Sequence, residues 1–207
     1  MQEYITVDGN STAEYVEKHS RFIANVFHCE TEEQASEIIS AQKSKYWDAR
    51  HNVYAYVLGD GTARFSDDGE PHGTAGKPVL DVINGSGITN VLIVVTRYFG
   101  GVLLGTGGLV KAYSTSARDA LLLAQRVLMC GCTQFTVCCD YANYDKLTRL
   151  ITDCGGMIQN TDFTDKIKIE FLFKDIDCND FLSKLCESFA SKITAEQKNK
   201  LFFPFKL

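Results

Sequence analysis

A near-continuous run of apolar, mostly β-branched residues at positions 91–96 most constrains what this chain can fold into. Such a run is typical of a central strand buried on both faces of a sheet, because a half-exposed strand would alternate with polar residues. The glycine-rich segment 100–108 follows, and an amphipathic helix is predicted over 109–124. The sequence therefore predicts a mixed domain of helices and strands built on this central strand.

Helices and strands are also predicted before the central strand. Thr31 is a suitable N-cap for a helix over 32–45, because its hydroxyl can accept a hydrogen bond from a free N–H group of the first turn. The segment 66–78 is polar and rich in glycine and proline, so it fits neither a helix nor a strand. The other predicted elements are strands at 4–7 and 13–27, a strand at 51–58 that ends in a turn at 59–61, and a short helix at 78–84.

The residues from 133 onward follow a compact β-α-β-β-α-β order, which is the split β-α-β, or ferredoxin-like, arrangement. Its strands are predicted at 133–139, 157–163, 166–173 and 193–207, and its helices at 144–154 and 177–190. The join lies near 127–131 and lacks a flexible linker. We therefore predict an α+β chain of two domains, 1–128 and 129–207.

Composition narrows the classes of function. The formal net charge is −5, so tight non-specific binding of a nucleic-acid backbone is not the default expectation. A local basic patch is still compatible with this net charge. No stretch approaches the roughly 18 consecutive apolar residues of a membrane span, and the first residues do not resemble a secretory signal. The eight cysteines are accordingly interpreted as reduced thiols of a cytoplasmic protein that does not associate with membranes.

The glycine-rich segment lies between a buried strand and a helix, which is where phosphate-binding loops occur. It matches neither known type, because Thr106 stands where a P-loop has lysine and Val110 stands where a dinucleotide-binding loop has its third glycine. Arg97 and Tyr98 end the strand, where ligands commonly meet mixed sheets. Because residues 102–104 are too apolar for an open loop tip, we expect them to pack against the domain.

The second polar segment, 66–76, has three carboxylates in four positions. Asp67, Asp68, Glu70 and His72 could hold a divalent cation, although their spacing fits no EF-hand. A solvated acidic turn is the plainer alternative. The sharper hypothesis is that these carboxylates pair with arginines at 97 and 50, which would join the two segments into one polar site.

Two segments together resemble the signature of the IMPACT/YigZ family. Segment 66–78 begins with Ser-Asp-Asp-Gly-Glu-Pro, and segment 94–109 contains Thr-Arg-Tyr-Phe-Gly-Gly. Further matches lie at 20–24 and 50–56, and the C-terminal part is similar to the second domain of bacterial members. The resemblance implies an N-terminal domain of the UPF0029 type, similar to domain 2 of ribosomal protein S5. It implies a C-terminal domain similar to domains III and V of elongation factor G. Eukaryotic members of the family restrain a stress-activated kinase that phosphorylates a translation initiation factor.

We therefore expect a translation-associated regulatory factor that binds the ribosome, RNA or a protein partner, and not primarily an enzyme. The alternative is an enzyme or binding protein for a small anionic ligand, bearing phosphate or carboxylate, in a cleft between 66–76 and 97–108. No nucleophile with an evident base stands out, so no catalytic residue, cofactor or metal is predicted. The candidate ligand-binding residues are Arg50, His51, Ser66, Asp67, Asp68, Glu70, Gly73, Thr74, Arg97, Tyr98, Gly100, Gly101, Thr106 and Gly107.

Overall fold

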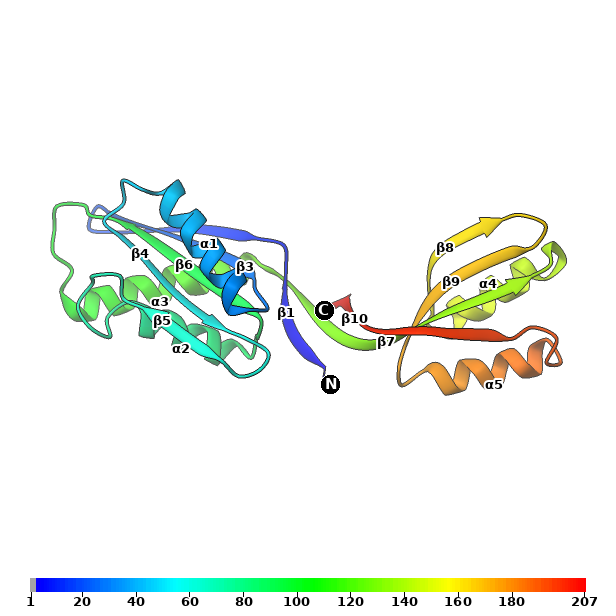
Figure 1. The fold of residues 1–207 in the computed structure, drawn as a ribbon. Coiled ribbons are helices and arrows are strands. Elements are labelled where there is room, and N and C mark those ends of the chain that lie inside the picture. Colours follow the sequence, from blue (N-terminus) through cyan, green and yellow to red (C-terminus); the bar gives the residue numbers. More distant parts are fainter. Residues whose placement is uncertain (1–2) are drawn as a thin grey trace. The chain divides into compact units, whose positions relative to one another are not determined.

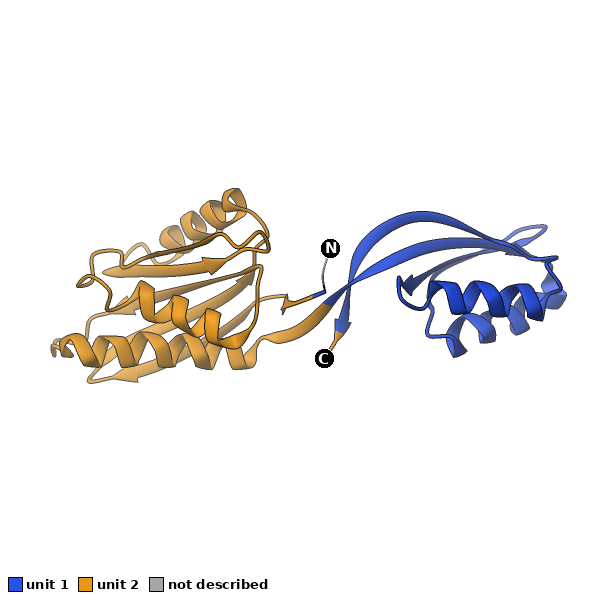
Figure 2. Ribbon diagram, turned by 90° about the horizontal axis from the view of Figure 1, so that it is seen from below, with its two compact units in different colours: residues 1–3, 129–205 blue, residues 4–128, 206–207 orange. Residues whose placement is uncertain are grey.

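The computed structural model describes residues 3–207 as ten strands, five α-helices and one short 3₁₀-helix (Figure 1). These residues form two compact units (Figure 2). Unit 2 contains Tyr4–Leu128 together with Lys206–Leu207, and unit 1 contains Met129–Phe205 together with Glu3. The mixed α and β fold class predicted from the sequence is confirmed.

Five strands of unit 2 form an antiparallel sheet in the order β2-β3-β6-β4-β5, so that β6 occupies the centre. The predicted central strand is confirmed and extends two residues further. The elements of this unit are β1 (Tyr4–Asp8), β2 (Ser11–Glu17), β3 (Ser20–His28), α1 (Glu32–Lys45), β4 (His51–Val57), β5 (Ala63–Ser66), α2 (Gly76–Ser86), β6 (Val91–Tyr98) and α3 (Gly105–Leu123).

Alternate side chains of β6 enter two different cores, because successive residues of a strand point to opposite faces of the sheet. Ile93 and Val95 pack in the larger core under α2 and α3. Leu92 and Val94 pack in a smaller core that includes Ala35 of α1. Helices therefore cover the sheet on both sides, which explains why every residue of β6 from Val91 to Arg97 is buried.

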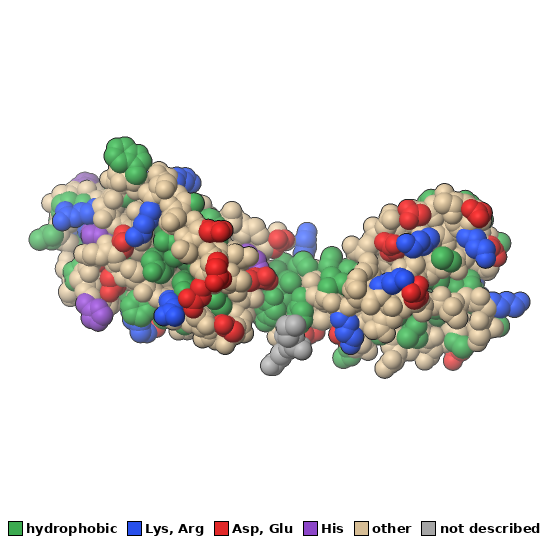
Figure 3. Space-filling view, in the orientation of Figure 1, with side chains coloured by type: hydrophobic (Ala, Val, Ile, Leu, Met, Phe, Trp, Pro, Cys, Tyr) green, Lys and Arg blue, Asp and Glu red, His purple; other side chains and the backbone are tan. Residues whose placement is uncertain are grey.

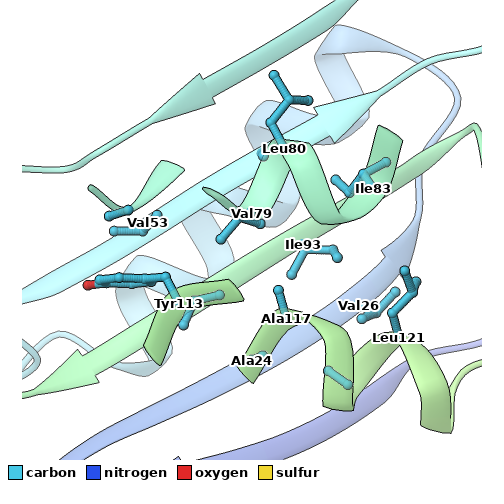
Figure 4. Packing of buried hydrophobic residues seen from close by; sticks show 14 of the residues in the cluster. Ala24, Val26, Val53, Val79, Leu80, Ile83, Ile93, Tyr113, Ala117 and Leu121 are labelled. Carbon is cyan, nitrogen blue, oxygen red and sulfur yellow. The ribbon is translucent and has the colours of Figure 1, made fainter. Parts of the chain in front are cut away.

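The larger core depends on one apolar stripe of α3. Tyr113, Ala117 and Leu121 are spaced four residues apart and thus lie on one face of the helix, facing the sheet (Figure 4). Ala117 and Ala24 of β3 are fully buried and small, which lets the helix approach the sheet closely. Tyr113 is fully buried near the end of this stripe, so its hydroxyl requires a buried partner.

The segment 13–27, predicted as one strand, is instead the hairpin of β2 and β3. Glu17 pairs with Ser20, which leaves Lys18 and His19 as a two-residue turn. Both turn residues have positive φ, 46° and 67°. Two-residue hairpin turns of this kind usually use Asn-Gly or Asp-Gly, so the sequence carried no recognisable turn signal here.

Several element boundaries also differ from the prediction. The short strand β5 lies at the edge of the sheet and was missed, since most of its residues are exposed and it lacks an apolar pattern. Helix α3 begins at Gly105, four residues earlier than predicted, because three of those four residues are glycines that disfavour helix in a sequence-based reading. Strand β7 (Gln125–Cys139) begins eight residues early, so the predicted join at 127–131 lies inside a strand.

Unit 1 has the predicted β-α-β-β-α-β order. After β7 come a 3₁₀-helix (Tyr141–Asn143), α4 (Tyr144–Asp153), β8 (Met157–Phe163), β9 (Ile167–Lys174), α5 (Cys178–Ser188) and β10 (Ala195–Lys206). Strand β7 lies between β9 and β10, with β8 beyond β9. This is the strand order of the split β-α-β arrangement.

An aromatic cluster forms the core of unit 1. Phe173 and Phe181 stack with ring centroids 4.4 Å apart, and Phe135 and Phe171 complete the cluster. All eight cysteines of the chain are free thiols. Among the described residues, no helix is both long and apolar enough to cross a membrane.

Candidate anion-binding site

Arg97 occupies an unusual position for a charged residue, because it lies in the central strand and is only 6% exposed. The sheet register places it opposite Phe22 of β3 and His51 of β4. Its position in the alternation of β6 directs it to the same face as Val95, under α2 and α3. A buried guanidinium requires compensation by partners that the fold brings to this point.

Glu70, in the segment between β5 and α2, provides the compensating charge. Arg97 Nη1 donates to Glu70 Oε1 at 2.6 Å, and the Tyr113 hydroxyl donates to the same oxygen at 2.8 Å. The guanidinium also lies over the rings of Phe22 and Phe99, 5.4 and 5.6 Å from their centroids. The pairing predicted between Arg97 and an acid of 66–76 is therefore present, at Glu70. The pairing predicted for Arg50 is not, since this arginine forms no ion pair among the described residues.

Tyr113 acts in this cluster as a fixed hydrogen-bond donor. Burial raises the pKa of its hydroxyl far above the usual range, and the adjacent Glu70 carboxylate raises it further. The hydroxyl therefore keeps its proton and the carboxylate remains an acceptor. Sequence reasoning missed Tyr113, because its place in the apolar stripe of α3 identified it only as a core residue.

Arg97 still has an unused donor. Its Nε is buried and has no hydrogen-bond partner among the described residues. A buried donor without a partner costs about 1–3 kcal/mol. An acceptor atom brought within hydrogen-bond distance of Nε would therefore stabilise the protein.

A cavity of about 350 Å³ adjoins this cluster. Both polar segments predicted from the sequence contribute to it, together with the start of α3. Its lining residues are Arg50, His51, Gly69, Glu70, Pro71, Arg97, Phe99, Leu103, Leu104, Gly105, Thr106 and Leu109. A cavity of this size can hold a phosphate or carboxylate group with part of the molecule that carries it.

His51 contributes a fixed tautomer to the wall of this cavity. Its Nδ1 lies 2.8 Å from the backbone oxygen of Asp68. A carbonyl oxygen can only accept, so Nδ1 carries the proton and donates. The other ring nitrogen, Nε2, lies 3.8 Å from Glu70 Oε1.

The first turn of α3 closes another side of the cavity. Gly105 and Thr106 line the cavity, and Leu104 at the N-cap position provides no side-chain hydrogen bond to the first turn. The first N–H groups of a helix have no partner within the helix and carry partial positive charge. The cavity thus combines a helix N-terminus with two arginines, Arg50 and Arg97, against one carboxylate, Glu70, and this balance favours an anion.

Exposed side chains form the rim of the cavity. Arg50 is exposed and lies over the Phe99 ring at 6.0 Å from its centroid. The expectation that residues 102–104 pack down is wrong for Val102 and Leu103, which are 43% and 83% exposed. Only Leu104 packs against the core. Gly101 and Gly105 have φ of 85° and 69°, so the backbone turns at both ends of this segment and directs it outward.

Four predicted residues of the segment before α2 shape that segment and do not line the cavity: Ser66, Asp67, Gly73 and Thr74. The Asp67 carboxylate accepts from the N–H groups of Gly73 and Gly76 at 2.8 Å, and from that of Ala75 at 3.2 Å. It thereby satisfies donors at the start of α2. The Ser66 hydroxyl accepts from the N–H of Asp68, and Thr74 donates to the Pro71 carbonyl.

Asp68 points elsewhere, so the hypothesis of a cation site is contradicted. Its carboxylate accepts from Lys43 Nζ and from the Asn52 N–H, both at 2.7 Å. The His72 side chain is 98% exposed. His72 Nδ1 lies 3.7 Å from Asp67 Oδ2, but Asp68 and Glu70 turn to other partners, and no three His, Cys, Asp or Glu side chains within the described chain are grouped to hold a metal.

Four further predicted residues also lie outside the cavity lining. Tyr98 points to the opposite face of the sheet from Arg97, where its hydroxyl donates to Asp48 Oδ1 at 2.8 Å. The Gly100 N–H donates to the Ser20 hydroxyl at 3.1 Å. Gly100, Gly101 and Gly107 set the path of the backbone around the site without contributing to its lining.

Two family models match the chain: the Impact N-terminal domain over residues 18–121, and a domain of unknown function (DUF1949) over residues 137–192. The chain is 37% identical to the IMPACT family member YigZ of Escherichia coli, over 82% of this chain and 85% of that protein. It is 35% identical to an IMPACT family member of Haemophilus influenzae, over 97% and 96% of the two chains. A solved structure described as that of a hypothetical protein is 33% identical and covers 94% of this chain and 97% of its own, with a TM-score of 0.63.

Proposed function

This chain belongs to the IMPACT family, and from that premise we propose that it is a regulatory binding protein of translation that engages single-stranded RNA through unit 2. The observation that carries the proposal is the cavity beside Arg97. There Arg97 and the uncapped start of α3 line the same space. Both features suit a phosphate oxygen.

The rim of the cavity supports RNA as the bearer of that phosphate. Phe99 is 41% exposed and has Arg50 beside it. An exposed aromatic ring next to an arginine is typical of proteins that bind single-stranded nucleic acids, because a base stacks on the ring while the arginine pairs with a backbone phosphate. Figure 3 shows hydrophobic side chains beside basic ones at the left end of unit 2.

The charge of the whole chain agrees with a local and selective contact. A net charge of −5 disfavours binding along an extended polyanion. One phosphate in the cavity and one or two stacked bases on the rim need only a few basic groups. No catalytic residue is assigned to this function.

Fluorescence anisotropy with a labelled single-stranded RNA tests the proposal. We expect binding that weakens with salt, and a loss of about tenfold or more in Phe99→Ala, since stacking of one base contributes about 1–3 kcal/mol. Arg50→Glu should weaken binding and Arg149→Glu on α4, an equal change of charge in unit 1, should not. Both Phe99 and Arg50 are exposed, so these variants should fold. Absence of binding at low salt, or equal effects of the two arginine variants, would exclude the RNA proposal.

A second candidate is a small anionic ligand, and the depth of the site favours it. Arg97 and Glu70 are buried at the base of the cavity, where a small molecule would be largely enclosed. Thermal unfolding with inorganic phosphate, adenosine monophosphate and citrate tests this candidate. A stabilisation by one of these anions that Arg50→Gln reduces, without any RNA binding, would favour it over the first proposal.

A further inference from the structure

A second and larger cavity of about 590 Å³ lies between α2 and α3, apart from the candidate anion site. Of its lining residues, only Gly73 was among the predicted site residues. We call it the helix groove. It is lined by Gly73, Lys77, Pro78, Asp81, Val82, Gly85, Ser86, Val110, Ser114, Arg118, Leu121, Leu122 and Arg126.

The lining residues form one stripe on each helix. On α2 they recur at positions 77, 81 and 85, and on α3 at 110, 114, 118 and 122, which is the four-residue spacing of a single helix face. From 110 to 122 the groove follows α3 for about 18 Å, at 1.5 Å per residue. This length matches about three turns of another helix.

The floor of the groove is apolar and partly open to solvent. Pro78 and Leu121 are buried below it, whereas Leu122 and Val110 are 67% and 39% exposed. A helix with one apolar face that docks into a groove typically covers exposed leucine and valine side chains beside an apolar floor. RNA would gain little from these side chains, because its backbone seeks polar partners.

The charges around the groove differ in sign from the chain as a whole. Lys77, Arg118 and Arg126 line the groove and are all exposed, against one acid, Asp81. Asp81 pairs with Lys77 one turn away on α2. Within the described chain, Arg118 and Arg126 form no ion pair. A positively charged groove on a protein of net charge −5 is complementary to an acidic partner.

We propose that the helix groove binds an acidic amphipathic helix of a partner protein. Its apolar face would cover Val82, Leu121 and Leu122, and its carboxylates would pair with Arg118 and Arg126. The anion site and the helix groove share no lining residue. The inference therefore stands or fails independently of the proposed RNA binding.

A synthetic helical peptide with leucines at four- and three-residue spacing and glutamates elsewhere is the probe for this proposal. Anisotropy should show binding, and the double variant Arg118→Glu/Arg126→Glu should weaken it at least about tenfold, because like charges across an interface cost several kcal/mol. Leu122→Gln should also weaken binding without affecting the fold, since this side chain is mostly exposed.

Three controls make the experiment decisive. A peptide of the same composition with scrambled leucine positions should bind weakly, which separates a docked helix from simple charge attraction. A double reversal outside the groove, Lys146→Glu/Arg149→Glu on α4, should leave peptide binding unchanged. Amide chemical shifts of α2 and α3 should change when the amphipathic peptide is added. The proposal is wrong if the amphipathic peptide does not bind, if the scrambled peptide binds equally, or if both double reversals have the same effect.

Discussion

At the scale of single residues, the site depends on places where the backbone leaves no room for a side chain. A Cβ atom at Gly100 would lie 2.1 Å from the carbonyl carbon and 2.3 Å from the oxygen of His19. Gly107, a few residues further on, would meet nothing within 4 Å. One glycine is therefore required by packing, whereas the other occupies a helical position that a larger residue could fill.

This contrast predicts opposite effects of the same substitution. Gly100→Ala should destabilise the protein by about 1–3 kcal/mol, the usual cost of overpacking, because the obstructing atoms belong to the backbone and cannot rotate away. Gly107→Ala should stabilise it by up to about 1 kcal/mol, since alanine is the better helix former. Urea unfolding of both variants measures the difference. Equal changes in the two variants would contradict the described path of the loop.

Tyr113 predicts a dependence of stability on pH. Its pKa is raised in the folded protein above the ordinary value of 10.0, so the folded state retains this proton more strongly than the unfolded state. Its stabilising contribution is therefore complete below about pH 10 and is lost as the pH rises above that value. Tyr113→Phe should cost about 1.5–3 kcal/mol at pH 7, the contribution of a hydrogen bond to a charged group.

Tyr113→Phe should then lose less stability than the parent protein between pH 10 and 11. Urea unfolding at pH 7, 10 and 11 gives the comparison. Tyr54→Phe on β4 is the control, because this tyrosine packs against the smaller core that includes Ala35, on the other face of the sheet from Arg97. Parallel stability curves for Tyr113→Phe and the parent protein would show that this proton is not coupled to folding.

At the scale of elements, the start of α2 depends on Asp67. Its carboxylate accepts from three backbone N–H groups at or before the first residue of the helix. Ala75, at the N-cap position, provides no side-chain hydrogen bond. One aspartate nine residues upstream of Gly76 thus replaces a local cap and ties the segment that carries Glu70 to the helix.

Asp67→Ala should accordingly destabilise the protein by about 1–2 kcal/mol, the range of a lost helix cap. Asp81→Ala on the same helix removes an equal charge, but its exposed pair with Lys77 contributes only about 0.2–0.5 kcal/mol. Guanidinium unfolding midpoints compare the two variants. If Asp81→Ala proves as costly as Asp67→Ala, the carboxylate at 67 does not act as the cap.

Sequence reasoning located the site but could not assign every role in it. Arg97 was predictable, because a charged residue that ends an apolar strand needs a partner. Glu70 could not be distinguished from Asp67 and Asp68, since the positive φ angles of Asp68, Gly69 and Gly73 decide which carboxylate turns inward. Tyr113 was hidden among core residues, because its contact with Glu70 spans 43 positions. The hairpin turn at Lys18 and His19 was not predictable, because neither residue is a glycine.

At the scale of the whole molecule, the chain contains cores that share no residue. Ile93 belongs to the large core of unit 2, and Phe171 belongs to the aromatic core of unit 1. The two family models also match separate stretches of sequence, 18–121 and 137–192. Each unit therefore has the apolar contacts needed for its own stability.

Core substitutions should therefore act mainly within one unit. Phe171→Ala should destabilise unit 1 by about 3–5 kcal/mol, the usual cost for a buried phenylalanine, and should accelerate amide exchange in α4 and α5. Amides of α2 and α3 should keep their protection. Ile93→Ala, likewise fully buried, should show the reverse pattern. Uniform acceleration across both units in either variant would show that they unfold as one.

The outward path of residues 102 and 103 has a thermodynamic consequence. Leu103 stands in solvent at the mouth of the cavity, so any ligand that enters will cover it and remove apolar surface from water. Transfer of such surface gives a negative change in heat capacity. Calorimetric titrations at several temperatures would therefore show a binding enthalpy that becomes more favourable on warming, and replacing this leucine by serine would flatten that slope.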